Sequence, residues 1–468
     1  MTSKRSGVFL SLALFASCHA GNNEDAPPPH VVVILADDLG YNDLGFTGCA
    51  DFDTPALDAL AAQGVVFTDG HVSAAVCAPS RAGLITGAHQ QRMGFESNLI
   101  YTESGTGLAR GARTLASRLQ DAGYATAGVG KWHLGSEEGQ HPLDVGFDRF
   151  TGLLKGARSY FPQLEKKQGK LTRIERNLEV VPEAELGYLT DFFSAEAVRL
   201  IESRDQNKPF FLYLSYTAPH TPMHAREDLL EHFSESIPDT KRRKYAAMVT
   251  AMDEGVAAVT EALQRNGMLE NTLLVFLSDN GGATNNSSDN GIWRGMKGSK
   301  WEGGHRVPFI AHWPKGFPSG IQYDLPVTSM DITPTALAAA GVQDKEGLDG
   351  VDLRPFLHGQ AGRPHQRLYW RRNVAAAVRD GDWKVIRIQE KDGTFREPLL
   401  FDLASDPSEE NNLAGQNPEK AAALLDLLAA WEENMQPSGW VQGDRWLNNQ
   451  RAKHKMSVIG RDAERAVP

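Results

Sequence analysis

Continuous runs of apolar residues, without polar alternation, mark the strands of this chain. Residues 30–36 (HVVVILA) and 272–278 (TLLVFLS) are rich in β-branched and other large apolar side chains. Such runs are typical of parallel strands that are buried on both faces of a sheet. Shorter runs at 125–129 and 210–215 have the same character. We expect these four segments to belong to one sheet.

Helical stretches lie between these strands. Segments 55–63, 114–122 and 190–203 have the length and spacing of apolar residues expected of helices. The alternation of strand and helix predicts an α/β fold, with a doubly wound mixed sheet flanked by helices. Open α/β sheets bind ligands beyond the carboxyl ends of their strands. The residues that follow each strand are therefore the candidates for chemistry.

The pattern changes after about residue 365, where short strand runs alternate with turn signals such as DGD and KDGT. This predicts a small antiparallel sheet, closed by an amphipathic helix rich in Ala and Leu at 418–433. The predicted strands are residues 367–370, 375–379, 383–388 and 399–402. We divide the chain into a larger domain, 30–365, and a C-terminal subdomain, 366–468.

The first 20 residues combine two positive charges with an apolar run, as in an export signal that is too short to span a membrane. The segment LFASC at 14–18 resembles a bacterial lipobox, whose cysteine is lipidated; cleavage after Ala20 is the competing interpretation. Residues 21–29 would form a flexible tether. We expect an exported protein of a bacterium, either periplasmic or anchored to the outer membrane through lipid on Cys18.

The composition argues against a disordered protein and against one that binds nucleic acid. With 41% hydrophobic and 23% charged residues among 468, the chain has the balance of a globular protein rather than a disordered one. Its 48 Lys and Arg against 59 Asp and Glu give a net charge of −11, so we expect no nucleic-acid partner. Any site for an anionic substrate must be basic locally.

Four oxygen-bearing side chains follow the two longest strand runs. Asp37 and Asp38 come directly after the first run, and Asp279 and Asn280 directly after the second. The set lacks the His and Cys grouping of a zinc site and favours a hard cation such as Ca²⁺. Either pair alone is common in turns and helix caps, but two pairs at matching strand ends favour a metal site.

Two further polar segments follow predicted strands. GKWHLG at 130–135 places Lys131 and His133 two residues apart, which puts them on one side of an extended chain. YTAPHTPM at 216–223 flanks His220 with prolines that stiffen the loop. Each histidine on its own is more often structural than catalytic.

The most informative segment is CAPSRAGLITG at 77–87, which resembles the type I sulfatase motif. In that family the cysteine is oxidised to formylglycine, an aldehyde whose hydrate is the nucleophile. The resemblance implies that Cys77 is a substrate of a formylglycine-generating or anaerobic sulfatase-maturating enzyme. Ala88 stands where the family usually has arginine, and Arg92 is a candidate to supply that charge.

The resemblance extends over the segments described above and implies an alkaline-phosphatase-like fold. Type I sulfatases hold one calcium ion with this D-D…D-N set and the formylglycine oxygen, which implies the ligands Asp37, Asp38, Cys77, Asp279 and Asn280. Segment 295–304 (GMKGSKWEGG) resembles the family's lysine placed five residues before a glutamate. That spacing selects Lys297 over Lys300, which we expect to be exposed. The polar stretch 285–290 is expected to be a mobile loop.

The resemblance also implies a mechanism. The catalytic residues would be Cys77, Arg81, Lys131, His133, His220 and Lys297. The hydrated aldehyde attacks sulfur with support from Arg81 and Lys131, while Lys297 and His220 hold the sulfate and assist departure of the alcohol. His133 is the base that lets sulfate leave by C–O cleavage.

We therefore expect a sulfuric ester hydrolase that acts on a sulfated carbohydrate. Segments 90–94 and 220–223 resemble those of family members in a way that implies galactose or N-acetylgalactosamine sulfates as substrates. The alternatives are a formylglycine-dependent phosphomonoester or phosphonate hydrolase and an inactive glycan-binding lipoprotein. With Cys18 lipidated or removed and Cys77 oxidised, only Cys49 remains, so no structural disulfide is expected.

Overall fold

The computed structural model describes residues 27–103, 105–164, 169 and 171–455. The predicted export signal at 1–20 and its cysteine, Cys18, lie outside the described residues. Within the described residues, no helix has both the length and the apolar character needed to cross a membrane.

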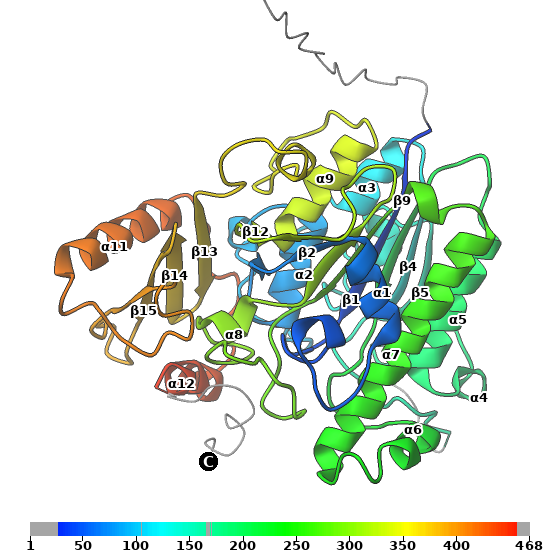
Figure 1. Ribbon diagram of the computed structural model, residues 1–468, viewed down its shortest axis with the longest axis horizontal. Coiled ribbons are helices and arrows are strands. Elements are labelled where there is room, and N and C mark those ends of the chain that lie inside the picture. The colour runs from blue at the N-terminus through cyan, green and yellow to red at the C-terminus, as the bar shows by residue number, and fades with distance from the viewer. Residues whose placement is uncertain (1–26, 104, 165–168, 170, 456–468) are drawn as a thin grey trace, which may run out of the picture.

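A ten-stranded mixed sheet runs through the larger part of the molecule (Figure 1), in the order β11-β2-β10-β9-β1-β8-β4-β5-β6-β7. The five central strands are parallel to one another. They are β9 (Thr272–Ser278), β1 (His30–Ala36), β8 (Phe210–Ser215), β4 (Ala125–Lys131) and β5 (Arg149–Leu153). The outer strands are β10 (Phe309–His312), β2 (Val65–Phe67), β11 (Ile321–Tyr323), β6 (Glu175–Arg176) and β7 (Glu179–Val180). The predicted doubly wound sheet is confirmed.

Helices cover both faces of this sheet, because its central strands are apolar on both sides. One face packs against α1 (Pro55–Gln63), α5 (Leu189–Glu202), α6 (Glu227–His232) and α7 (Thr240–Arg265). The other packs against α2 (Cys77–Thr86), α3 (Leu115–Asp121) and α9 (Ile332–Ala339). Successive side chains of a strand point to opposite faces, so Val32 and Ile34 of β1 join the first cluster while Val31 and Val33 join the second.

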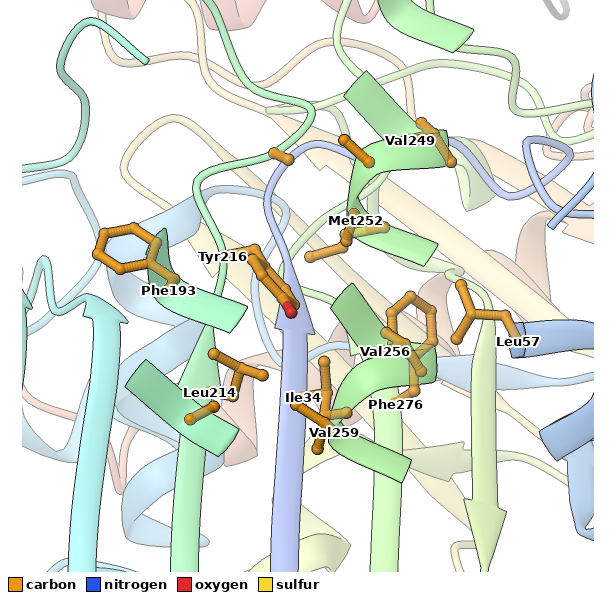
Figure 2. Close-up of a cluster of buried hydrophobic side chains, with 14 of the residues drawn as sticks. Ile34, Leu57, Phe193, Leu214, Tyr216, Val249, Met252, Val256, Val259 and Phe276 are labelled. Carbon is orange, nitrogen blue, oxygen red and sulfur yellow. The ribbon is translucent and has the colours of Figure 1, made fainter. Parts of the chain in front are cut away.

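Figure 2 shows part of the core between the sheet and α7. Ile34, Leu214 and Phe276 come from the neighbouring strands β1, β8 and β9, and Met252 and Val256 of α7 lie over them. All five side chains are completely buried. Burying each such side chain contributes about 1.5–3 kcal/mol, so the central strands are held firmly and their carboxyl ends form a rigid platform.

Short elements complete the larger domain. They are β3 (Gly70–His71), β12 (Val327–Thr328), α4 (Glu183–Leu186), α8 (Glu302–His305) and α10 (Arg354–Leu357). Strands β3 and β12 pair in parallel as a separate two-stranded sheet.

A four-stranded antiparallel sheet stands beside the larger domain (left in Figure 1), as the sequence predicts. Its strands are β13 (Arg367–Arg372), β14 (Ala375–Asp380), β15 (Trp383–Ile388) and β16 (Leu399–Asp402). Helix α11 (Pro418–Glu432) buries Leu424 and Leu428 against β14 and β15. A further helix, α12 (Asp444–Lys453), was not predicted, because the polar sequence there carries no clear apolar face.

His454, directly after α12, connects this helix to the larger domain. Its ring Nε2 accepts a hydrogen bond from the backbone N–H of Lys300 at 2.9 Å, and Nδ1 donates to the carbonyl of Gln450 at 2.6 Å. Only a neutral imidazole can make both bonds. Burial lowers the pKa of His454 to about 3, although the Gln450 carbonyl opposes the shift.

We expect this histidine to make folding sensitive to acid. Because its pKa in the folded protein is below that of an unfolded chain, its contribution is complete above about pH 6.5 and is lost as the pH falls. Between about pH 6.5 and 5 the loss amounts to about 2 kcal/mol. Thermal unfolding at these two pH values should show a smaller drop for His454→Gln than for the unsubstituted protein. Equal drops would mean that the ring is not held neutral.

Candidate active site

Two pairs of oxygen ligands leave the sheet side by side. Strands β1 and β9 are paired in register up to their last residues. Asp37 and Asp38 therefore emerge beside Asp279 and Asn280, and the backbone N–H of Asp38 donates to Asp279 Oδ1 at 3.2 Å. All four side chains are buried. The structure thus brings together the residues that the sequence offers as metal ligands.

The next two strands contribute the basic residues. Strand β8 is adjacent to β1 and leads into the loop of His220, and β4 is adjacent to β8 and ends at Lys131. His133 follows in a left-handed backbone conformation, with φ of 59°. Four neighbouring strand ends therefore converge on one site, at the carboxyl edge where parallel sheets bind ligands.

Each of the three carboxylates has a close cationic partner. The pairs are Lys131 with Asp37 at 2.6 Å, Lys297 with Asp38 at 2.6 Å and Arg81 with Asp279 at 2.8 Å. Burial alone would raise the pKa of Asp37, but Lys131, followed by His220 and Arg81, holds it below its usual range. Burial and repulsion from Asp37 raise the pKa of Asp279 by more than Arg81 lowers it. A further cation among these carboxylates would relieve that repulsion.

Two oxygen atoms without a hydrogen bond mark where such a cation fits. Asp37 Oδ1 and Asn280 Oδ1 are buried and have no hydrogen-bond partner among the described residues. Ligand atoms of Asp37, Asp38, Cys77 and His220 all lie within 4.8 Å of one another. Leaving a buried oxygen unbonded costs about 1–3 kcal/mol, and a hard cation would remove that cost. The residues present therefore fit a divalent ion with oxygen ligands.

Cys77 lies beside this cluster as the first residue of α2. Its Sγ is 3.0 Å from Lys297 Nζ and 3.9 Å from Asp38 Oδ1, and the residue is 1% exposed. Burial raises the pKa of the thiol to about 12, although Lys131 and Lys297 oppose the shift. The thiol is therefore protonated at neutral pH and is a poor nucleophile in its unmodified form.

Arg81, one turn further along α2, ties the helix to the strand ends. Its Nε donates to Asp279 Oδ2 at 2.8 Å, and its Nη1 donates to the carbonyl of Lys131 at 3.2 Å and to the hydroxyl of Ser215. The side chain is completely buried. Arg81 thus fixes Cys77 relative to β4, β8 and β9.

The two histidines differ in their surroundings. His133 stacks on Tyr101, with ring centroids 6.4 Å apart, and burial together with Lys131 lowers its pKa well below the usual value, so it is neutral and able to accept a proton. His220 donates from Nδ1 to the carbonyl of Thr221 at 2.6 Å, which leaves Nε2 facing Asp38 Oδ2 at 3.6 Å. Burial lowers the pKa of His220, while Asp37 and Asp38 oppose the shift.

The comparisons with known proteins identify this arrangement. The Sulfatase family model matches residues 29–342, which span the whole site. The chain belongs to the sulfatase family. A second model, N-sulphoglucosamine sulphohydrolase, C-terminal, matches residues 296–433 of this sulfatase.

Individual relatives agree with the assignment. Human arylsulfatase A is 34% identical over 459 residues, which cover 86% of this chain and 88% of the relative. Mouse arylsulfatase J is 35% identical over 331 residues, covering 69% of this chain but only 55% of that relative. The crystal structure of Ps i-CgsB in complex with k-i-k-neocarrahexaose matches with a TM-score of 0.83 and 35% identity, covering 91% of this chain and 98% of that one. The sulfatase is thus a sulfuric ester hydrolase that acts on sulfated substrates.

A buried ion cluster holds the turn that carries Lys297 in this sulfatase. Lys384 Nζ lies 2.8 Å from Glu302 Oε1 and 2.8 Å from Glu409 Oε1, and the three side chains are fully buried. His71, Glu302 and His305 could together hold a metal ion by their geometry. The Lys384 ammonium already contacts Glu302 and, at 3.3 Å, His305 Nε2, so it takes the place of a metal there.

Two expectations about the surroundings of the site are wrong. Lys300 was expected to be exposed, but only 1% of it is accessible, because the C-terminal segment around His454 covers it. Residues 285–290 do not form a loose polar loop. Asn286 is buried, and its Nδ2 donates to the carbonyl of Asp38 at 3.0 Å, so this loop supports the Asp37–Asp38 turn. Tyr101 was not among the predicted site residues, since a single Tyr outside any motif carries no local signal.

Proposed function

We propose that this sulfatase removes sulfate from a sulfated carbohydrate through a formylglycine formed from Cys77, assisted by one calcium ion. The observation that carries the proposal is the position of Cys77 Sγ, which is 3.0 Å from Lys297 Nζ beside three buried carboxylates. The calcium ligands would be Asp37, Asp38, residue 77, Asp279 and Asn280. Cys77 would be oxidised by a formylglycine-generating or anaerobic sulfatase-maturating enzyme.

Side chains of this protein would stabilise charge and transfer protons in the reaction. When present, the hydrated aldehyde would supply the nucleophile and the calcium ion a positive charge for the oxygens around it. Arg81, Lys131 and Lys297 hold the negative charge of the ester in a buried, prearranged setting, which is worth more than in water. Because Nδ1 of His220 already donates to Thr221, His220 would have to be doubly protonated, as Asp37 and Asp38 favour, for its Nε2 to deliver a proton to the departing sugar oxygen. Neutral His133 would accept the proton given up by residue 77 when sulfate is released.

A carbohydrate is the proposed substrate class for two reasons. The Ps i-CgsB structure, at 35% identity, was solved with an oligosaccharide, k-i-k-neocarrahexaose. The leader-like first 20 residues favour export from a bacterium, to the periplasm or to an outer-membrane lipid anchor, where polysaccharides are met. Within that class we propose galactose or N-acetylgalactosamine sulfates.

The test compares a sulfate and a phosphate ester of one phenol, and two series of sulfated sugars. The protein is co-expressed with a formylglycine-generating enzyme and assayed on 4-nitrophenyl sulfate, on 4-nitrophenyl phosphate and on sulfated galactose and glucosamine saccharides. We expect sulfate turnover to exceed phosphate turnover and the galactose series to exceed the glucosamine series. Equal or faster phosphate hydrolysis would contradict the sulfatase mechanism, and a preference for glucosamine would contradict the substrate class alone.

His220→Ala gives a sharper test of the leaving-group step. A sugar alkoxide is a poor leaving group and needs a proton, whereas 4-nitrophenolate does not. We expect kcat on a sugar sulfate to fall by about 10²–10⁴-fold, the usual contribution of general acid catalysis, and kcat on 4-nitrophenyl sulfate to fall far less. A parallel loss on both esters would show that His220 binds the sulfate without protonating the alcohol.

A further inference from the structure

Three cations gather beside the turn that carries Lys297, outside the catalytic cluster. Lys300 lies in the turn, Arg372 ends β13 and Lys453 ends α12. Lys300 and Arg372 are 1% and 6% exposed, and Lys453 is half-buried. A Cβ placed on Gly298 would lie 3.1 Å from both Arg372 Nη1 and Lys453 Nζ. Two cationic groups from the C-terminal subdomain therefore lie close together over Gly298, at a position where a side chain would crowd them.

Among the described residues, these cations lack counter-ions. Over the part of the chain that the structure describes, no carboxylate forms an ion pair with Lys300, Arg372 or Lys453. The nearby Glu96 is already bound by Arg371, at 2.6 Å. Arg372 Nε is buried with no hydrogen-bond partner among those residues, and its Nη2 contacts Gln442 Oε1 at 3.3 Å. Unpaired buried charge is expensive, so the arrangement suits an incoming anion.

The balance of charge here differs from that in the catalytic cluster. In the catalytic cluster each of the three carboxylates has a cation within 2.8 Å, whereas Lys300, Arg372 and Lys453 form no ion pair with any described carboxylate. Burial and the neighbouring Arg372 lower the pKa of Lys300 to about 7, and the same two causes lower that of Lys453. A bound anion would raise both pKa values and restore full charge to the lysines.

The backbone of Lys297 links this cluster to the reacting centre. Its side chain reaches Cys77 Sγ at 3.0 Å, while its carbonyl accepts a hydrogen bond from Lys453 Nζ. The adjoining residue is Gly298, one Cα step of about 3.8 Å away. An anion held by Arg372 and Lys453 would thus lie beside the turn whose lysine reaches Cys77.

We propose that Arg372 and Lys453 form a second oxyanion subsite, which binds a sulfate or carboxylate of the substrate next to the sulfate that is removed. The inference rests on the proposed carbohydrate sulfatase function. Such a subsite makes the enzyme selective for carbohydrates that carry at least two neighbouring anionic groups. Lys300 adds positive charge from within the turn.

The experiment uses the full-length, matured enzyme and matched pairs of galactose-type disaccharides. One member of each pair carries the scissile sulfate alone, and the other also carries a neighbouring sulfate or, in a separate arm, a carboxylate. We expect the second anion to raise kcat/KM, mainly through KM. In Arg372→Gln and Lys453→Gln the ratio of kcat/KM for the two members should fall by about tenfold or more, the usual loss for a charge-assisted hydrogen bond.

Matched controls lie on the same elements. Arg367→Gln, near the start of β13, and Lys455→Gln, just beyond α12, should leave that ratio unchanged, and Arg372→Lys should recover part of it. An unchanged ratio in both Arg372→Gln and Lys453→Gln would overturn the subsite, as would wild-type enzyme that ignores the second anion. If wild-type enzyme hydrolyses no sulfated saccharide but cleaves 4-nitrophenyl sulfate, the proposed substrate class fails and this inference fails with it.

Discussion

Replacing Cys77 with alanine is expected to lower sulfate-ester hydrolysis by at least about 10³-fold, because it removes both the proposed nucleophile and a proposed calcium ligand. The thiol itself cannot explain activity, since burial raises its pKa to about 12 and keeps it protonated. Oxidation of the side chain to an aldehyde is what would give residue 77 a nucleophile at neutral pH.

Mass spectrometry of the peptide that contains residue 77 provides the direct measurement. In active enzyme co-expressed with a maturating enzyme, we expect the mass change that corresponds to exchange of H₂S for oxygen. Ala88 occupies the position in the maturation motif where the family usually has arginine. Arg92, which could supply that positive charge instead, is paired with Asp349 at 2.6 Å. Partial conversion would therefore be reflected in proportionally lower specific activity.

Cys49→Ala is the matched control. Cys49 is a free cysteine that lies 3.8 Å from Arg242 and has no contact with the catalytic cluster. We expect this variant to keep full activity and an unchanged mass at residue 77. A fully active preparation in which residue 77 remains a thiol would refute the formylglycine mechanism.

The sequence is most informative where parallel strands end. Runs such as 30–36 and 272–278 are apolar on both faces, so they predict central strands, and neighbouring parallel strands deliver their next residues to one edge. This reasoning alone brings Asp37, Asp38 and Asp279 together. The role of residue 77 did not follow from it, because only the family resemblance connects a buried thiol with an aldehyde.

The contribution of the C-terminal subdomain to the site is the hardest part to predict from the sequence. Arg372 and Lys453 are 81 residues apart by their numbers and far from Lys297, and each stands in an ordinary charged stretch. Their convergence depends on how the small sheet and α12 dock on the larger domain, through bonds such as His454 to Lys300. The same docking buries Lys300, which local polarity alone would leave exposed.

The second large effect is expected at the carboxylate cluster. Asp37→Asn removes one of three buried carboxylates and so weakens binding of the proposed calcium ion, and we expect activity to fall by at least about 10²-fold. The substitution also leaves the Lys131 ammonium without its partner at 2.6 Å. Breaking a buried ion pair in this way typically costs about 3–5 kcal/mol of stability.

Calcium titrations separate the loss of calcium binding from the loss of the Asp37–Lys131 ion pair. An ion that binds only the folded protein stabilises it by about 2.7 kcal/mol at a hundredfold excess over its Kd, so added Ca²⁺ should raise the Tm of wild-type enzyme after treatment with a chelator. The Tm of Asp37→Asn should respond much less. Restored activity of the chelated wild-type enzyme on adding Ca²⁺ would follow the same concentration dependence.

The double variant Asp37→Asn, Lys131→Met controls for the unpaired charge. With the ammonium also removed, we expect much of the lost stability to return while activity and the response to Ca²⁺ stay low, because the ligand oxygen is still missing. If the double variant regained calcium-dependent stabilisation, Asp37 would be a partner of Lys131 only and not a metal ligand. If the chelator left wild-type activity unchanged, the carboxylate cluster would serve the cations alone, and sulfate binding would rest on Arg81, Lys131 and Lys297.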